Sequence, residues 1–331
     1  MNKLNIDHGD TRKELAKYPD GYFNLIITSP PYADARKNHY DSISPDNFPD
    51  FILSFHDQFW RVLAEDGSFV LNIKDKVIDG VRNRYVWKTI MAFAEKGWKC
   101  VDDYLWIKPN AMPGYWPNRL RDEWEYCFHM TKNNKFAMYQ DAVKKPMGEW
   151  AEKRLAKLNG KSAIRHNSEN NSGFGRDLRK WIGKDWVLPG NTVCVPLIGK
   201  NMGHPAVFPV GLPDFFIKLF SKENDNILDP FAGSGSTGLS ALRLNRNVTL
   251  IETKEEYIKV IKERLHEYII QYSMFDSSGK ETTMVSEPSL NKPYSVLKHV
   301  RRKAVNRKPS SRKQKAVDTK IKEKKRKTAS S

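Results

Sequence analysis

The sequence predicts an α/β protein with a doubly wound, mostly parallel sheet. β-type runs alternate with amphipathic helical patterns along most of the 331 residues, which is typical of a parallel sheet covered on both faces. Two of these runs, 23–27 and 226–228, end in short strings rich in proline or glycine. Such strings are expected where strands end at the carboxyl edge of the sheet, so both should border a site there.

The first half of the chain contains the pattern of four strands and two helices. Phenylalanines at three- and four-residue spacing over 48–63 predict one amphipathic helix, with Ser44 and Pro45 as its N-cap and first residue. Gly67 is expected to break the chain before the next strand, and Gly97 to end the second helix. The strands are expected at 23–27, 68–73, 104–107 and 125–130, and the second helix around 86–93.

The second half begins with an irregular region and then returns to regular patterns. Lys, Asn, Gly and Ser dominate from Thr131 to Gly175, where the sequence predicts an insertion with a short helix at 150–158. No pattern persists from Ser273 onward. Between them, helices are expected at 212–220, from Thr237 and at 255–272, and strands at 226–228 and 247–251.

Positive charge is concentrated at the end of the chain. The net charge is +17, and residues 297–331 hold fifteen Lys or Arg and two acids, which leaves +4 for the rest. A tail with so few apolar residues is expected to be disordered and to attract DNA independently of sequence. A nuclear-import signal at 324–327 and a merely solubilising tail are alternatives. The chain shows no secretory signal and no apolar run near the roughly 20 residues of a membrane helix, so an intracellular protein is expected.

The three cysteines do not form a recognisable site. Cys100, Cys127 and Cys194 are far apart and none belongs to a paired motif. This spacing argues against a zinc site and a disulfide framework, and it fits a reducing compartment. No metal is expected.

A glycine-rich turn follows the strand at 226–228. Gly233, Gly235 and Gly238 fit the G-x-G-x-x-G pattern between a strand and a helix. Glu252 ends the next strand, 23 residues after Asp229, where a carboxylate can bind both ribose hydroxyls of an adenosine-containing cofactor. A nicotinamide-dependent oxidoreductase shares this pattern, and a tight turn that only packs helix on strand is the structural alternative.

The string Thr28-Ser29-Pro30-Pro31-Tyr32 suits chemistry on the amino group of a base. That nitrogen is a poor nucleophile because its lone pair is delocalised into the ring. The Ser29 hydroxyl and the Pro30 carbonyl can accept both amino hydrogens, which frees the lone pair. The two prolines hold the carbonyl rigidly, and Tyr32 offers a face for an extruded base. A turn that merely ends a strand is the alternative.

Together the two turns resemble the signature of the amino-group DNA methyltransferases, which make N4-methylcytosine or N6-methyladenine. The Ser-Pro-Pro-Tyr turn precedes the glycine turn, which resembles the β-class order. The resemblance implies a Rossmann-like, circularly permuted fold with an inserted target-recognition region, S-adenosylmethionine as cofactor and double-stranded DNA as substrate. It implies catalytic roles for Ser29, Pro30, Pro31 and Tyr32, and cofactor contacts from Asp10, His204, Pro205, Asp229, Phe231, Gly233, Ser234, Gly235, Thr237 and Glu252.

The likeness extends over about residues 5–268, apart from 131–203. It includes Gly9-Asp10, which is expected ahead of the first strand and resembles the family's acidic position near the adenosyl base. The strings 105–110 and 123–126 resemble later sheet motifs of the family, and 204–213 resembles the segment that embraces the methionine end of the cofactor.

The target base is predicted to be cytosine. In the family, Ser at the position of Ser29 is typical of cytosine-N4 enzymes and Asp of adenine enzymes, so an adenine-N6 enzyme is the alternative. Cytosine C5 chemistry needs a cysteine within a Pro-Cys pair, and this sequence has none. Cys194 is expected to be a buried strand thiol.

The resemblance divides the chain into four parts. Residues 1–130 and 204–272 are expected to form the catalytic and cofactor-binding halves of one domain. Residues 131–203 are the expected target-recognition insertion, whose Lys and Arg would contact phosphates and base edges, and 273–331 form the basic tail.

Two other classes of protein fit less well. An oxidoreductase leaves Ser29–Tyr32 and the basic tail unexplained, and a decayed, non-catalytic DNA-binding protein would not keep Ser29, Tyr32, Asp229 and Glu252 intact. By family analogy we expect a restriction endonuclease of the same specificity as functional partner. The expected location is the cytoplasm of a prokaryotic or phage-infected cell, or the nucleus in a eukaryotic host.

Overall fold

The computed structural model describes residues 2–33, 43–158, 164–165, 176–197 and 209–276. The first part of the chain contains β1 (Leu4–His8), α1 (Thr11–Leu15), β2 (Phe23–Thr28), α2 (Phe48–Leu53), α3 (His56–Val62), β3 (Leu63–Ile73), β4 (Val77–Ile78), β5 (Val81–Arg82), α4 (Tyr85–Glu95), β6 (Lys99–Ile107) and β7 (Trp124–Thr131). The middle contains η1 (Gln140–Val143), β8 (Lys145–Pro146), α5 (Glu149–Ala156), β9 (Ile164–Arg165), β10 (Arg176–Asp177), η2 (Arg179–Trp181), β11 (Trp186–Val187) and β12 (Thr192–Cys194). The last part contains α6 (Gly211–Phe220), β13 (Asn226–Asp229), α7 (Ser236–Arg243), β14 (Asn247–Glu252) and α8 (Glu255–Asp276).

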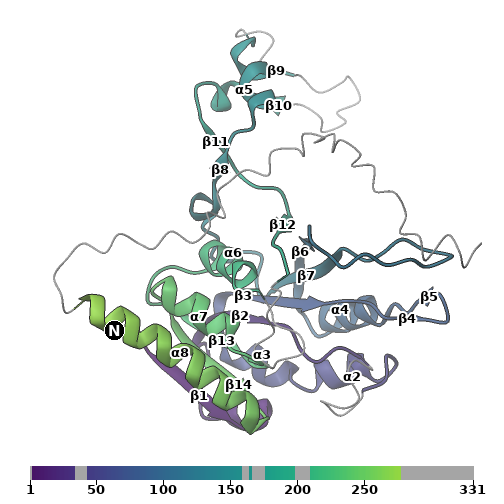
Figure 1. Ribbon diagram of the computed structural model, residues 1–331, viewed down its shortest axis with the longest axis vertical. Helices are drawn as coiled ribbons and strands as arrows, with labels where there is room; N and C mark the ends of the chain where they lie inside the picture. The colour runs from purple at the N-terminus through teal and green to yellow at the C-terminus, as the bar shows by residue number, and fades with distance from the viewer. Residues whose placement is uncertain (1, 34–42, 159–163, 166–175, 198–208, 277–331) are drawn as a thin grey trace, which may run out of the picture. The chain divides into compact units, whose positions relative to one another are not determined.

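The main sheet of the described residues has eight strands in the order β1-β14-β13-β2-β3-β7-β6-β12 (Figure 1). β7 is antiparallel to both of its neighbours, and the other pairs are parallel. From β2 the chain continues to β3 on one side, whereas from β13 it continues to β14 on the other. The strand order therefore reverses between β13 and β2, which is where such a sheet opens a crevice at its carboxyl edge. The predicted fold class is confirmed.

Two hydrophobic cores lie on opposite faces of the sheet, because side chains alternate along the strands. On β2, Ile26 belongs to one core, and Leu25 and Ile27 belong to the other. The core that contains Ile26 is completed by buried side chains of α1, α2, α3 and α4. The other core is completed by α6, α7 and α8. This arrangement covers both faces, as the alternating pattern predicted.

The single helix predicted over 48–63 is wrong. The chain forms α2 and α3, which are separated at Ser54 and Phe55, and Leu63 already has the extended backbone of β3. The Ser54 hydroxyl donates to the Phe51 carbonyl at 2.6 Å, a side-chain bond that competes with helix continuation. Ser44 and Pro45 do not begin the helix, because Asn47 is the N-cap of α2.

Gly67 does not end a chain segment as predicted, since it lies within β3. It does mark an irregular part of the ladder, because Leu63 pairs with Phe23 and Ser68 already pairs with Leu25. A Cβ on Gly67 would lie 2.8 Å from Leu63 Cδ1 and 3.0 Å from the Asn24 carbonyl oxygen, so any larger residue would have to displace the packing of this bulge.

Three further expectations need correction. Gly9 and Asp10 follow a strand, β1, that the sequence pattern did not predict. Cys194 lies in a strand as expected, but it is exposed and the neighbouring Val193 is buried. The strand that contains them, β12, belongs to the main sheet although it lies within the range expected for the recognition insertion. Of the predicted disordered tail, 273–331, residues 273–276 belong instead to α8, and residues 277–331 lie outside the described residues. Within the described part of the chain, no helix is long and apolar enough to cross a membrane.

Candidate active site

A buried carboxylate joins the two turns that the sequence singled out. Asp229, at the end of β13, accepts a hydrogen bond at 2.7 Å from the hydroxyl of Thr28, which ends β2. Its other carboxylate oxygen accepts the Thr237 hydroxyl at 2.6 Å. Burial raises the pKa of Asp229 to about 6, although the hydrogen bonds from Thr237 and Thr28 oppose that rise. Asp229 therefore fixes Ser29, the next residue after Thr28, beside the glycine turn.

The glycine turn requires its glycines. Gly233 and Gly235 have φ angles of 52° and 78°, in the left-handed region where a side chain is strained. A Cβ on Gly238 would lie 2.6 Å from Leu250 Cδ1, so glycine lets α7 pack closely on β14. Within the turn Gly233 is half-buried, whereas Ala232, Ser234 and Gly235 are buried, so a ligand would meet the turn at Gly233.

Glu252 is bound to the backbone of the same region. Its Oε2 accepts the Gly233 amide at 2.9 Å, and its Oε1 accepts the amides of Thr253 and Lys254 at 2.9 and 3.0 Å. Burial raises the pKa of Glu252, and these amides oppose the rise. A carboxylate has about four acceptor positions. The remaining position on Oε2 suits one ligand hydroxyl, whereas the sequence predicted that both ribose hydroxyls would bind here.

Asp10 lies at the same edge of the sheet. The Gly9 amide donates to the Glu252 carbonyl at 3.0 Å, and the Thr11 hydroxyl donates to the Pro230 carbonyl at 2.6 Å. These bonds bring the ends of β1, β13 and β14 together around Asp10. The Asp10 carboxylate is the N-cap of α1 and pairs with Arg12 at 2.6 Å, an interaction that lowers the pKa of Asp10.

The other predicted cofactor contacts have protein partners or fall outside the described residues. The Ser234 hydroxyl is 3.3 Å from the Arg264 guanidinium of α8, and the Thr237 hydroxyl donates to Asp229. The ring of Phe231 packs edge-on against Phe55 at 5.0 Å. His204 and Pro205 lie among the residues that the structure does not describe.

The turn after β2 is held through the hydroxyl of Tyr32. The Ser29 hydroxyl donates to the Tyr32 oxygen at 3.3 Å, and Glu125 Oε2 and Asn72 Oδ1 lie 2.7 and 3.1 Å from that oxygen. Pro30 is buried, and Ser29, Pro31 and Tyr32 are half-buried. Burial, with Glu125 beside it, raises the pKa of Tyr32 well above its ordinary value, so the phenol stays protonated.

Sequence reasoning missed three residues that surround Tyr32. Asn72 lies near the end of β3, Glu125 near the start of the antiparallel β7, and Lys108 directly after β6, so all three lie at the carboxyl edge of β2. Lys108 forms an ion pair with Glu125, and both are buried. For Lys108 and Glu125, the sequence signal that could have indicated the pair is their opposite charge within the strings 105–110 and 123–126.

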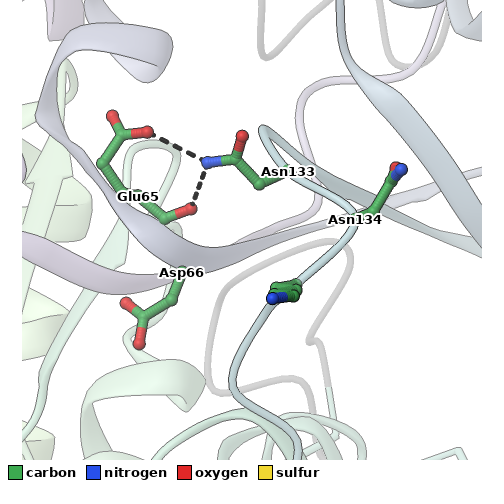
Figure 2. A pocket seen from close by; sticks show the side chains of 5 residues that line it. Glu65, Asp66, Asn133 and Asn134 are labelled. Atoms are coloured by element: carbon green, nitrogen blue, oxygen red, sulfur yellow. Dashed lines mark hydrogen bonds between the residues drawn. The ribbon is translucent and has the colours of Figure 1, made fainter.

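A separate surface hollow is lined by Glu65, Asp66, Asn133 and Asn134 (Figure 2). The Asn133 amide donates to the Glu65 carbonyl and carboxylate at 2.9 and 3.0 Å. Glu65 is near the start of β3, whereas Asn72 is near its end. This hollow therefore lies at the opposite edge of the sheet from Ser29 and does not belong to the site.

The fold and the two joined turns define a methyltransferase-type α/β enzyme that acts on an amino group. The sequence model of the DNA methylase family, N6_N4_Mtase, matches residues 23–263, which include both turns. The chain belongs to this family of amino-group DNA methyltransferases, as the resemblance of its motifs indicated.

Several bacterial relatives are similar over most of their length. The type II methyltransferase M.PvuII of Proteus hauseri is 29% identical over 286 residues, which cover 76% of this chain and 80% of the relative. The type II methyltransferase M.SmaI of Serratia marcescens is 26% identical over 299 residues, which cover 80% of this chain and 91% of the relative.

Solved structures support the fold. The cytosine-N4-specific PvuII DNA methyltransferase matches with a TM-score of 0.61 at 24% identity, covering 85% of this chain and 94% of that one. The putative DNA modification methylase TTHA0409 of Thermus thermophilus, complexed with S-adenosyl-L-methionine, matches with a TM-score of 0.52 at 22% identity, covering 80% and 93%.

Proposed function

We propose that this chain transfers a methyl group from S-adenosylmethionine to the N4 amino group of a cytosine in double-stranded DNA. The observation that carries the proposal is the hydrogen bond between Thr28 and Asp229, because it sets the Ser29–Tyr32 turn beside the glycine turn. Ser29 and the cytosine-N4 specificity of the similar PvuII enzyme support cytosine as the base. Methylation of adenine N6 by the same site is the alternative outcome.

The residues around the glycine turn fit the cofactor. The turn is only half-buried at Gly233, Glu252 keeps an acceptor position for a ribose hydroxyl, and Asp10 lies beside it. S-adenosylmethionine, when bound, supplies a methyl group on a positively charged sulfur, which a nucleophile can displace. Asp229 would orient this region through the backbone, since its own oxygens are used by Thr28, Thr237 and Phe231.

The turn after β2 would prepare the amino group for attack. The Ser29 oxygen and the Pro30 carbonyl would accept its two hydrogens, and the ring of Tyr32 would contact the extruded base. Accepting both hydrogens favours a tetrahedral nitrogen whose lone pair is free. Because Pro30 is buried and flanked by Pro31, its carbonyl would be held in place before the base arrives, and this preorganisation would contribute to the rate.

DNA binding would combine the recognition region and the tail. In the described part of 131–203, Lys144 and Lys184 lie over the ring of Trp186 at 3.7 and 4.4 Å and gather positive charge at one place. The tail of residues 297–331 adds a net charge of +13. Removal of the tail should weaken DNA binding and reduce its salt dependence. In a restriction-modification system, an endonuclease of the same specificity in the prokaryotic cytoplasm would be the functional partner.

The proposal is tested by nucleoside mass spectrometry of duplex DNA after incubation with the protein and S-adenosylmethionine. N4-methylcytosine is the expected product. N6-methyladenine would retain the mechanism and change the base, whereas the absence of both, with the cofactor measurably bound, would contradict DNA as the substrate. Samples without protein and samples without cofactor are the controls.

A further inference from the structure

Two hydrogen-bond acceptors lie near the Tyr32 hydroxyl, which has only one proton to donate. Glu125 Oε2 lies 2.7 Å away and Asn72 Oδ1 lies 3.1 Å away, and both can only accept. The orientation of the Asn72 amide is fixed, because its nitrogen donates to the Tyr126 carbonyl at 2.9 Å. A phenol carries one proton, so Tyr32 donates to one of these oxygens and has no proton left for Ser29.

The direction of the whole chain of hydrogen bonds follows from this count. Glu125 is closer than Asn72 and forms an ion pair with Lys108, and a charged acceptor makes the stronger bond, so Glu125 takes the Tyr32 proton. The Tyr32 oxygen can then act towards Ser29 only as an acceptor. Ser29 must donate its own proton at 3.3 Å, which leaves the lone pairs of its oxygen for a ligand.

We propose that Glu125, paired with Lys108, is a positioning residue that acts through Tyr32 to keep Ser29 a hydrogen-bond acceptor, so that the site selects an exocyclic amino group and rejects a carbonyl oxygen at the same place. The inference rests on the proposed function and deepens it. It explains how the site distinguishes cytosine from uracil, since the two bases differ at that position by an amino group against an oxygen.

The burial of the ion pair supports a role beyond stability. Glu125 and Lys108 are 6% and 8% exposed, and Lys108 Nζ lies 4.3 Å from the centre of the Trp106 ring. The free energy cost of transferring two charges from water into the protein interior is about as large as the attraction between them. A neutral pair would pack here as well, but it would not dictate which partner of Tyr32 accepts.

Two variants test the direction of the bonds. Glu125→Gln keeps the shape, but its amide can turn an N–H towards Tyr32, so that only Asn72 Oδ1, at 3.1 Å, still competes with Ser29, at 3.3 Å, for the Tyr32 proton. Tyr32→Phe removes the hydroxyl and leaves the ion pair in place, so it remains informative if Glu125→Gln is unstable. The matched control is Glu65→Gln, which also neutralises a carboxylate paired with a buried lysine, Lys132 at 3.1 Å, at the opposite edge of the sheet.

The measurement is the affinity for two duplexes that differ only at the mapped target base, with S-adenosylhomocysteine present. Wild type and Glu65→Gln should bind cytosine at least tenfold more tightly than uracil. Glu125→Gln and Tyr32→Phe should reduce that ratio to threefold or less and slow methyl transfer at least tenfold, with cofactor affinity unchanged. If the wild-type product is N6-methyladenine, adenine and hypoxanthine replace the two bases.

A tenfold ratio retained by both variants would overturn the inference. A loss of cofactor affinity in parallel with the ratio would also overturn it, because it would indicate a structural role. Failure of the proposed function is recognised separately, since it is the absence of a methylated base with the wild-type protein. The binding ratio is measured at the base that this product maps, so failure of the inference alone is an unchanged ratio in the variants of a protein whose wild type methylates DNA.

Discussion

The two turns of the site end neighbouring strands of one sheet, but they are held in different ways. The glycine turn after β13 is held by groups of the last part of the chain: by glycine backbone geometry, by amides that donate to Asp229 and Glu252, and by Arg264 of α8, which donates to the Ser234 carbonyl. The turn after β2 is held by side chains from distant strands, since Tyr32 contacts Asn72 of β3 and Glu125 of β7. A locally held turn can bind its ligand before the rest of the site is complete. The turn held from a distance is sensitive to the packing of the whole sheet edge.

Removal of the Ser29 hydroxyl should have the largest effect and should distinguish the roles of the two turns most clearly. Ser29→Ala should lower the rate of methyl transfer by about 100- to 1,000-fold, the effect typical of losing one preorganised hydrogen-bonding group. The affinity for S-adenosylmethionine should stay within twofold, because Ser29 does not hold the glycine turn. Single-turnover kinetics and calorimetry measure the two quantities. A joint loss of both would contradict the division between the turns.

The pKa of Asp229 predicts a pH dependence for the residue that joins the turns. Because the folded pKa of Asp229 is raised from its ordinary 3.8 to about 6, the folded state binds the proton more tightly, so this carboxyl costs stability as pH rises. Between about pH 3 and pH 7 the wild type should lose about 3 kcal/mol of unfolding free energy relative to Asp229→Asn. Denaturant unfolding at several pH values measures this difference. A constant difference would contradict the burial of an ionisable group at this point.

Alanine at Gly235 should damage the locally held turn. The φ of 78° and the Ile261 side chain, 3.2 Å from a Cβ at this position, should together cost about 1–3 kcal/mol of stability and weaken cofactor binding. Gly183→Ala is the matched control, because Gly183 has a φ of 77° with open space around it. It should cost about 1–2 kcal/mol and leave cofactor affinity unchanged. Equal losses of cofactor affinity in the two variants would refute the argument.

The smallest effect is expected at the bond between the turns. Thr28→Val keeps the volume of a buried side chain and removes its hydrogen bond to Asp229, so the unfolding free energy should fall by about 1–2 kcal/mol. The rate of methyl transfer should fall more than cofactor affinity, because Ser29 follows Thr28 directly. An unchanged rate would show that the Tyr32 contacts alone position Ser29.

The difference between local and long-range contacts also explains which parts of the site could be predicted from the sequence. The strand-turn-helix around Asp229 and its distance from Glu252 are local patterns, and the structure places them together as expected. Asn72, Lys108 and Glu125 were missed as members of the site, because their meeting at Tyr32 depends on the antiparallel register of β7 against β3 and β6. β1 was missed because an edge strand of five half-buried or exposed residues has a weak pattern. The split between α2 and α3 depends on one serine hydroxyl, which periodicity does not register.

The most direct test of the central claim is a crystal structure with sinefungin, an S-adenosylmethionine analogue that carries an amine in place of the transferable methyl group. We expect the adenosine to lie against the glycine turn, with a ribose hydroxyl on Glu252 and the amine directed towards Ser29 and the Pro30 carbonyl. An analogue bound elsewhere, or an amine directed away from the Ser29–Tyr32 turn, would contradict the account that the two turns form one active site.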